Sequence, residues 1–225
     1  MCGIAGIVYS DQNRKVEQDL LIRMCSAIRH RGPDDTGIRV EGSMGIGMTR
    51  LSIIDLSSGH QPIHNEYCSI WIVFNGEIYN YPELRKDLAE RGHCFYTASD
   101  TETIVHLYEE YGEDCVKHLR GMFAFAIWDK KKKELFVARD RLGIKPFYYF
   151  FDGKRFVFGS EIKSILQSGE VTSEPYRPAI VNYFFYGYQP GEETMFKGIR
   201  KLMPGHAIKY KDGGISIHRY WDVEY

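Results

Sequence analysis

The sequence predicts an α+β fold built from antiparallel strands, and three observations carry this prediction. Short apolar segments recur in pairs around polar turns, as in a hairpin, and helical patterns occur in clusters between the pairs. Neither G-x-G-x-x-G nor G-x-x-x-x-G-K-[ST] occurs in the chain, which argues against a βαβ nucleotide-binding fold. The 225 residues are enough for one sizeable core, so we expect a single domain over 1–225.

The N-terminal elements follow from apolar periodicity. A β-branched run at 4–9 predicts a buried strand. Apolar residues every fourth position predict a helix over about 15–29, and the Arg-His-Arg-Gly-Pro-Asp-Asp segment at 29–35 ends it. Two strands at 37–40 and 44–49 are expected to pair, and residues 50–55 to continue the second of them.

The middle of the chain predicts one strand and two helices. A strongly apolar strand at 69–74 is expected to end at Asn75-Gly76, which then lies at its mouth. Pro82 near the first position begins a helix. The spacing of Ser99 and Glu102 is that of a capping box, which predicts a second helix running to about Tyr111.

The C-terminal half predicts further hairpins and three helices. We expect a loop rich in Gly and Pro over 189–205. The expected helices are 114–119, 160–167 and 176–185, and the expected strand pairs are 122–128 with 134–139, 147–151 with 156–158, and 206–210 with 215–220.

Composition excludes several classes of function. Lys and Arg number 29 against 30 Asp and Glu, so no basic excess suggests nucleic acid or an anionic membrane surface. No apolar stretch approaches 18 residues, and the N-terminus lacks a signal peptide. Five widely spaced cysteines without a C-x-x-C pattern favour reduced thiols in a cytoplasmic protein.

The sequence gives no reason to expect a metal site. His60 and His64 are four residues apart, but Pro62 between them argues against a helix that would bring them together. We therefore expect no metal and no cofactor in this chain.

The first candidate for chemistry is Cys2. If Met1 is removed, Cys2 carries a thiol and a free α-amine, and an α-amine loses its proton close enough to neutral pH to act as a base toward the thiol. The alternative is a small residue at a frayed chain start, and Cys2 alone does not decide between them.

Three more positions are candidates, each with a structural alternative. Arg50 is a bidentate carboxylate clamp or a surface residue. Asn75 and Gly76 place a side-chain amide beside a backbone N–H, as an oxyanion hole requires, or they form a turn. Asp100 receives a ligand's ammonium group or favours the dipole of its helix.

Several motifs together resemble one family, the class II glutamine amidotransferases, which are N-terminal nucleophile hydrolases. They are Met-Cys-Gly-Ile-Ala-Gly at 1–6, the segment at 29–35, Arg-Leu-Ser-Ile-Ile-Asp at 50–55, Asn-Gly-Glu-Ile-Tyr-Asn at 75–80 and Ser-Asp-Thr-Glu at 99–102. Further motifs at 121–129, 139–149 and 158–164 are similar to the glutaminase domain of glutamine-hydrolysing asparagine synthetases. The resemblance covers nearly the whole chain.

The resemblance implies a four-layer αββα sandwich of two antiparallel sheets and a set of roles. Cys2 is the nucleophile, and Asn75 with the Gly76 N–H stabilises the oxyanion. The remaining substrate contacts bind glutamine: Arg50 its α-carboxylate, Asp100 with help from Glu77 its α-ammonium, and the segment Leu51, Ser52, Ile53 and Ile54 the wall of the pocket.

The resemblance also implies a partner that this sequence does not contain. Asparagine synthetases have a second domain that uses ATP and Mg²⁺ to activate aspartate, and its Ser-Gly-Gly-x-Asp-Ser loop is absent here. We expect a domain core at about 2–210, with 211–225 starting a linker to that domain, and we favour a fragment over a stand-alone subunit. A homodimer, a glutaminase serving another synthetase, and a non-catalytic glutamine-sensing or docking module remain alternatives.

Overall fold

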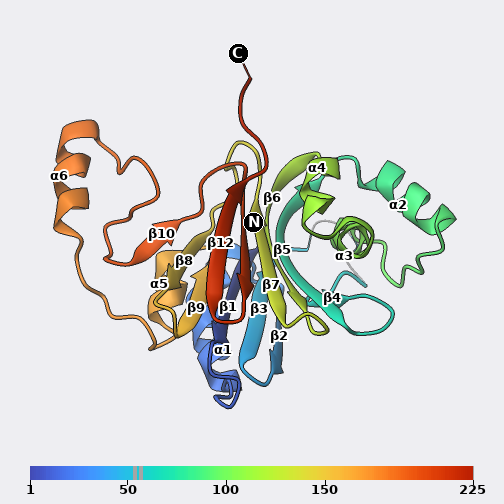
Figure 1. Cartoon of the computed structure of the whole chain (residues 1–225), viewed down its shortest axis with the longest axis horizontal. Helices are drawn as coiled ribbons and strands as arrows, with labels where there is room; N and C mark the ends of the chain where they lie inside the picture. Colours follow the sequence, from blue (N-terminus) through green and yellow to red (C-terminus); the bar gives the residue numbers. More distant parts are fainter. Residues whose placement is uncertain (53–54, 56–57, 225) are drawn as a thin grey trace.

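The computed structural model describes residues 1–52, 55 and 58–224, which form two antiparallel sheets packed face to face between helices (Figure 1). The first sheet has the strand order β10-β8-β9-β1-β3-β2. Its strands are β1 (Gly3–Tyr9), β2 (Asp35–Glu41), β3 (Met44–Arg50), β8 (Tyr148–Phe151), β9 (Arg155–Gly159) and β10 (Ile199–Lys201).

The second sheet has the strand order β12-β11-β7-β6-β5-β4. It contains the longest strands of the described chain and most of its hairpins. Its strands are β4 (Ile63–His64), β5 (Ile70–Ile78), β6 (Gly121–Asp129), β7 (Glu134–Arg139), β11 (His206–Lys211) and β12 (Gly214–Arg219).

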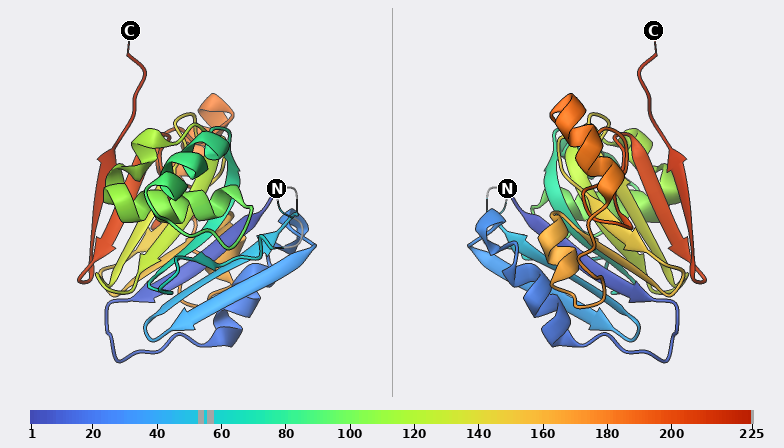
Figure 2. Two further views of the ribbon diagram at one scale, coloured as in Figure 1. Left: turned by 90° about the vertical axis from the view of Figure 1, so that its right-hand side faces the viewer. Right: turned by 90° about the vertical axis from the view of Figure 1, so that its left-hand side faces the viewer.

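Helices cover the outer faces of the two sheets. Figure 2 shows α2, α3 and α4 (green) on one side of the molecule, and α6 (orange) standing on the other. The helices are α1 (Gln18–Ser26), α2 (Tyr81–Glu90), α3 (Asp100–Tyr111), α4 (Cys115–His118), α5 (Ile162–Leu166) and α6 (Arg177–Tyr186), with 3₁₀ turns η1 (Arg29–Arg31) and η2 (Gly112–Asp114).

Three apolar clusters fill the spaces between these four layers. One lies between α1, α5 and the first sheet, one between the sheets, and one between the second sheet and α2, α3 and α4. Side chains alternate along each strand, so Ile4 and Val8 of β1 meet Val73 of β5 in the middle layer. The αββα sandwich that the resemblance implies is thereby confirmed.

The structure corrects two predicted boundaries that bear on the site. β5 does not end at Phe74: it continues through Asn75 and Gly76 to Ile78, because these residues pair with 121–124 of β6. β3 ends at Arg50, so the expected continuation of that strand toward residue 55 is wrong as far as Leu51 and Ser52 are described.

Other elements differ in extent. Helix α1 spans Gln18–Ser26 rather than 15–29, because residues 27–28 form a turn and Arg29 begins η1. β10 lies within the segment 189–205 that was expected to be loop, and β4 was not expected at all. Both are two or three residues long, too short for a periodicity signal.

The predicted capping box at α3 is not formed. Ser99 caps the helix, since its Oγ accepts a hydrogen bond from Thr101 N at 3.2 Å. The buried Glu102 side chain turns to the preceding loop instead, where it accepts from Tyr96 N at 2.8 Å and Thr97 N at 2.7 Å. Glu102 therefore fastens residues 96–97 to the helix that follows them.

The C-terminal strands belong to the second sheet. β12 pairs with β11 over residues 214–219, so the sheet extends past the boundary near 210 that the sequence suggested for the core. None of the helices in the described ranges has both the length and the apolar character needed to span a bilayer.

Gly6 provides a test of the packing between β1 and its neighbours. A Cβ at Gly6 would lie 2.4 Å from the buried Phe158 ring and 2.8 Å from Gly45 O. We expect Gly6→Ala to lower the free energy of unfolding by about 1–3 kcal/mol, measured by urea denaturation. Gly214→Ala is the matched control, since a Cβ there would make only an ordinary contact, 3.6 Å from Lys211 O. Equal stability of the two variants would contradict this packing.

Candidate active site

A cavity of about 150 Å³ opens between the start of β1, the end of β3, strand β5 and the first turn of α3. Its lining includes Cys2, Arg50, Asn75, Gly76 and Asp100. These residues are far apart in the sequence, and the two sheets together with α3 bring them to one place. The central prediction of the sequence, that these five positions share one site, therefore agrees with the structure.

The Cys2 thiol is held by the main chain of Leu51. Leu51 N donates to Cys2 Sγ at 3.4 Å, and Cys2 Sγ donates to Leu51 O at 3.6 Å. The Cys2 carbonyl accepts from Arg31 Nε at 2.9 Å, and Arg31 also pairs with Glu161 at 3.0 Å. The chain start is therefore fixed against the first sheet, because both its side chain and its backbone are bonded.

Asn75 faces Cys2 across the layer between the sheets. Val73, two residues before Asn75 in β5, packs in the cluster between the sheets, and Cys2 packs against the same cluster. Because side chains alternate along a strand, the Asn75 side chain points into the same layer. Asn75 is 1% exposed, and its Nδ2 has no hydrogen-bond partner among the described residues. A buried amide donor without an acceptor is costly, so it marks a place where a ligand oxygen fits.

The Gly76 N–H lies on the open edge of β5. β4 pairs with β5 only at Trp71 and Ile72, and beyond them the N–H groups of alternate residues point to this edge. Phe74 N donates to Gln61 Oε1 at 2.7 Å, and Ile78 N donates to Asp100 Oδ2 at 3.0 Å. The Gly76 N–H lies between these two and faces the cavity that Gly76 lines.

Gly76 is also required by strand packing. A Cβ at this position would lie 2.2 Å from Met122 O and 2.8 Å from Phe123 Cα of the neighbouring β6. Gly121 of β6 has the same relation to Glu77 O, at 2.2 Å. The two strands therefore approach so closely at the site that only glycine fits at either position.

The Arg50 guanidinium is buried at the end of β3. Arg50 is 4% exposed, and its Nη2 donates to Asp55 O at 2.5 Å. Gly59 makes room for it, since a Cβ there would lie 2.6 Å from Arg50 Nη2. The guanidinium is thus set in one orientation against the cavity wall, where it can serve a carboxylate.

Asp55 fixes the loop that carries this contact. Its carboxylate accepts from Ser58 N at 2.9 Å and from Ala98 N at 2.8 Å. Burial acts to raise the pKa of Asp55, but the hydrogen bonds from Ser58 and Ala98 outweigh it, with Arg50 adding to them, and hold the pKa below its usual value. Asp55 is therefore a stable anion that ties the Arg50 loop to the residues just before α3.

Asp100 differs from Asp55 in its electrostatics. It is 3% exposed at the first position of α3, and burial raises the pKa of its carboxyl group although Ile78 N donates to it. Nearby Glu77 raises the pKa further. A buried carboxylate with a raised pKa gains most from a cation, so Asp100 is suited to an ammonium group.

The other predicted substrate contacts divide into three groups. Glu77 lines the cavity beside Gly76. Ser52 is not part of the cavity lining, and its backbone N–H donates to Asp34 Oδ2 at 2.8 Å. Ile53 and Ile54 lie outside the described residues.

Four residues of the site were not predicted from the sequence. Arg31 bonds the Cys2 carbonyl, Gln61 bonds the β5 edge, Gly59 accommodates Arg50, and Lys145 lines the cavity and donates to Met1 Sδ at 3.4 Å. Arg31 lies in a loop that the sequence marked as polar and rigid. No local pattern singles out the other three, because their roles depend on segments distant in sequence.

His60 and His64 do not form a shared site. His60 Nδ1 lies 2.7 Å from Asp35 Oδ2, while His64 Nδ1 lies 2.7 Å from its neighbour's carbonyl, Asn65 O. Each imidazole thus has a separate partner.

A protein-family comparison identifies the chain. The family model described as a glutamine amidotransferase domain matches residues 1–221. The chain belongs to this family of glutamine amidotransferase domains. The match covers every residue of the cavity named above, from Cys2 to Lys145.

Known relatives agree with this assignment. The chain is 43% identical to asparagine synthetase [glutamine-hydrolyzing] 3 of Bacillus subtilis, covering 100% of this chain and 37% of that protein. It is 42% identical to a putative asparagine synthetase [glutamine-hydrolyzing] 2 of Methanocaldococcus jannaschii, covering 98% and 46%. The chain thus spans less than half the length of these relatives.

A solved structure supports the fold independently. The glutamine phosphoribosylpyrophosphate amidotransferase of B. subtilis superposes with a TM-score of 0.71 over 98% of this chain and 49% of that one. At 20% sequence identity this similarity bears on the fold alone.

Proposed function

We propose that this domain hydrolyses glutamine to glutamate and ammonia through a γ-glutamyl thioester on Cys2. The observation that carries the proposal is the unpartnered Asn75 Nδ2, which faces the layer where the Cys2 thiol lies. Arg50 and Asp100 line the same cavity with opposite charges. A thiol, an amide donor and two opposite charges together match an amino acid with a side-chain carboxamide.

The charged residues select the substrate by both ends of its amino-acid group. Arg50 binds the α-carboxylate, and Asp100 with Glu77 binds the α-ammonium. The buried Asp100 carboxylate accepts from the neutral donors Ile78 N and Ser99 Oγ, and the ammonium adds a positive charge to this environment. An analogue that lacks either charge leaves a buried partner unpaired and is rejected.

The chemistry proceeds by nucleophilic displacement. The α-amine of Cys2, freed by removal of Met1, accepts the thiol proton while Sγ bonds to the amide carbon of the glutamine side chain. The resulting oxyanion accepts hydrogen bonds from Asn75 Nδ2 and the Gly76 N–H. The α-ammonium then gives its proton to the leaving nitrogen, and the C–N bond breaks to release ammonia.

Hydrolysis of the thioester reverses the roles. The α-amine takes a proton from water while the water oxygen attacks the thioester carbon, and the same two donors stabilise the second oxyanion. The C–S bond breaks, the thiolate regains its proton, and glutamate leaves. Each turn consumes one glutamine and one water and needs no cofactor.

A second candidate function is a non-catalytic glutamine-sensing or docking module. It is favoured by one observation: with Met1 attached, the Cys2 nitrogen is part of a peptide bond, and the Met1 side chain is placed by Lys145 at the cavity. Retention of Met1 removes the base from the mechanism, so the mass of the purified protein separates the two functions.

The ammonia serves, in our proposal, an ATP- and Mg²⁺-dependent synthetase part that amidates aspartate. The two asparagine synthetase relatives, of which this chain spans less than half, support it. Helix α6 projects from the body in Figure 1 and exposes Phe184 and Phe185 at 83% and 80%, which provides an apolar surface for such a partner. A different synthetase as ammonia acceptor is the alternative. Five free thiols fit a cytoplasmic enzyme.

Cys2→Ala tests the nucleophile. We expect glutamate release to fall by at least about 10³-fold, since no other group replaces the sulfur. Cys68→Ala is the matched control, because its exposed thiol lies outside the cavity lining. Glutamate release by an unimpaired Cys2→Ala protein would refute the mechanism. A wild-type protein that retains Met1, binds glutamine and does not hydrolyse it would establish the sensing module instead.

Asn75→Ala tests the oxyanion donor. We expect kcat to fall by roughly 10²–10³-fold with little change in KM, because Nδ2 bonds the charge that develops in the transition state. Steady-state kinetics measure both constants, and Asn13→Ala in an exposed turn is the control. An equal rise in KM with unchanged kcat would assign Asn75 to ground-state binding.

Asp100→Asn separates binding from stability. Loss of a charge-assisted hydrogen bond is expected to raise the KM for glutamine roughly 10- to 100-fold. Burial raises the pKa of Asp100, so above that pKa the ionised carboxylate lowers the stability of the folded protein. The neutral amide of the variant avoids this cost, and the variant should melt at an equal or higher temperature. In the wild type, KM should rise as pH falls through the raised pKa. A variant with lower thermal stability and unchanged KM would show a structural role.

A further inference from the structure

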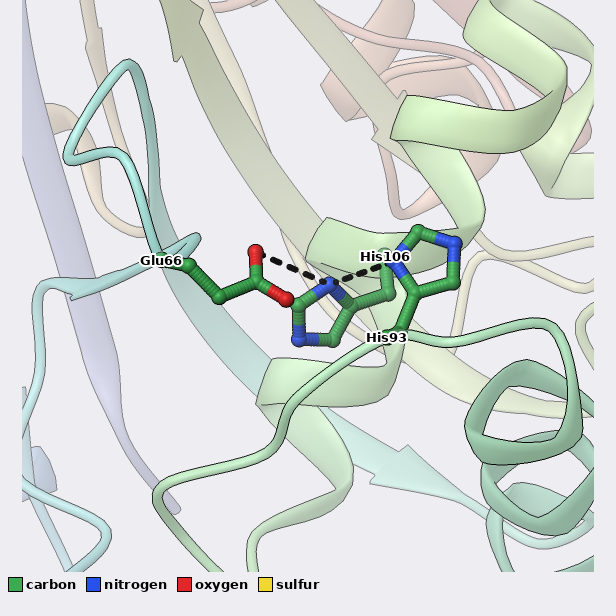
Figure 3. Close-up of side chains that lie close together, drawn as sticks. All are labelled: Glu66, His93 and His106. Atoms are coloured by element: carbon green, nitrogen blue, oxygen red, sulfur yellow. Dashed lines mark hydrogen bonds and ion pairs between the residues drawn. The ribbon is translucent and has the colours of Figure 1, made fainter.

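A cluster of imidazole and carboxylate groups lies outside the cavity, where three segments of the chain meet. Figure 3 shows Glu66 from the loop after β4, His93 from the loop after α2, and His106 from α3, with their side chains directed toward one another. One ligand atom of each residue lies within 4.8 Å of the others. Glu109, one turn along α3, joins the cluster through His106.

Four separations between inner atoms of these residues lie near those of a tetrahedral metal site. His93 Nδ1 lies 3.1 Å from His106 Nδ1, and Glu109 Oε2 lies 2.9 Å from His106 Nδ1 and 3.6 Å from His93 Nδ1. Glu66 Oε2 lies 4.0 Å from His106 Nδ1. Metal–ligand bonds of about 2.0–2.1 Å place tetrahedral ligand atoms about 3.3–3.4 Å apart, so the observed separations fall on both sides of that value.

The outer atoms of the histidines face further carboxylates. His93 Nε2 lies 3.0 Å from Glu110 Oε1, and His106 Nε2 lies 3.6 Å from Glu102 Oε1. For His93, the carboxylate at Nε2 favours the tautomer with its proton there, which leaves the Nδ1 lone pair directed inward. His106 Nε2 is buried without a hydrogen-bond partner among the described residues, and its Nδ1 is the atom that faces the cluster. The two Nδ1 atoms lie 3.1 Å apart, a separation that fits either a metal ion between them or a proton held by one of them and donated to the other.

The carboxylate ligands are fixed in the same way. Glu66 Oε1 accepts from Cys94 N at 2.8 Å, and Glu109 Oε1 accepts from Asn65 Nδ2 at 2.7 Å. One oxygen of each carboxylate is thus held by the protein, and the other is left to point inward. His93, Glu66 and Glu109 thus have outer partners of the kind that orient metal ligands in known sites.

We propose that His93 Nδ1, His106 Nδ1, Glu66 Oε2 and Glu109 Oε2 bind one zinc ion. Two imidazoles and two carboxylates are a donor set suited to four-coordinate Zn²⁺, and the two ligand carboxylates balance its charge. The site replaces the expectation from sequence that the chain binds no metal. Zinc reaches the site from the Glu66 side, where the side chain is 28% exposed. The His106 side chain, at 0% exposure, forms the inner side of the site.

The competing occupant is a proton. Burial lowers the pKa of His106, but the Glu102 and Glu109 carboxylates outweigh burial and raise it to about 9 in the protein without metal. A protonated His106 then donates to Glu109, and His93 accepts no metal. Zinc and the proton require the same nitrogen, so metal content distinguishes the two states.

The position of the cluster assigns the zinc a structural role. It joins the Glu66 and His93 loops to α3, whose first residue is Asp100. The residues between His93 and Asp100 include Ala98, which bonds Asp55 beside Arg50. The zinc thereby holds the helix that presents Asp100 and the loop that leads to it, at a distance from the Cys2 chemistry.

Elemental analysis of the untagged full-length chain tests the proposal. After expression with zinc and gel filtration in metal-free buffer, we expect about one zinc per chain, and chelation should lower the melting temperature reversibly. Replacement by Co²⁺ should give the visible absorption of a tetrahedral site. Glu110→Gln should weaken zinc binding roughly 10- to 100-fold, as loss of an outer partner does, and His93→Gln should weaken it further.

Two further variants keep the test decisive. Glu66→Gln changes an exposed residue, so it tests ligation even where His106→Gln fails to fold. His218→Gln on β12 is the matched control and should retain zinc. A folded wild-type chain that takes up no zinc when metal is supplied would show that the cluster holds only a proton. Zinc retained equally in His93→Gln and Glu66→Gln would place an adventitious ion elsewhere. These readouts do not depend on glutaminase activity.

Discussion

The open edge of β5 is the constraint on which the site depends. β4 covers this edge only as far as Ile72. Beyond it, the backbone N–H groups of the alternate residues Phe74, Gly76 and Ile78 need other acceptors. Gln61 takes the first and Asp100 takes the third, while the N–H of Gly76 between them faces the cavity. A sheet edge that would otherwise invite another strand is thereby converted into a binding surface with one donor left for a ligand.

Two aspartates near this edge both accept hydrogen bonds but differ in burial, and this difference sets the pKa of each. Asp55 is satisfied by donors from Ser58 and Ala98, its pKa lies below the usual value, and it holds the loop in place. Asp100 also accepts hydrogen bonds, among them one from Ile78 N, but it is much more deeply buried, and burial outweighs these bonds and raises its pKa. The protein therefore bears an electrostatic cost at Asp100, as expected of a residue with the proposed role of binding an ammonium group.

Helix α3 connects the substrate site with the second cluster. Its first turn presents Asp100 to the cavity, and Glu102 one turn on holds the loop at Tyr96 and Thr97. Its next turns direct His106 and Glu109 to the proposed zinc. Under the two proposals, a change at the zinc cluster acts on glutamine affinity through the position of this helix rather than through the reacting atoms.

The sequence by itself determined the elements and the chemistry of the site. Apolar patterning predicted the hairpins, the Ser99 pattern predicted the start of α3, and motifs around Cys2, Arg50, Asn75 and Asp100 predicted which groups line one cavity. These signals are local, because each depends on residues within a few positions of one another. They can therefore be recognised without knowledge of the fold.

Only the tertiary structure decided how these groups are placed. Asn75-Gly76 is a turn signal in isolation, but pairing with β6 overrides it and extends β5 through both residues. The space for Arg50 beside Gly59, and the meeting of Glu66 with His93 and His106, join segments with no common motif. Such contacts depend on how sheets and helices pack against one another, and packing is a property of the whole chain that no single stretch encodes.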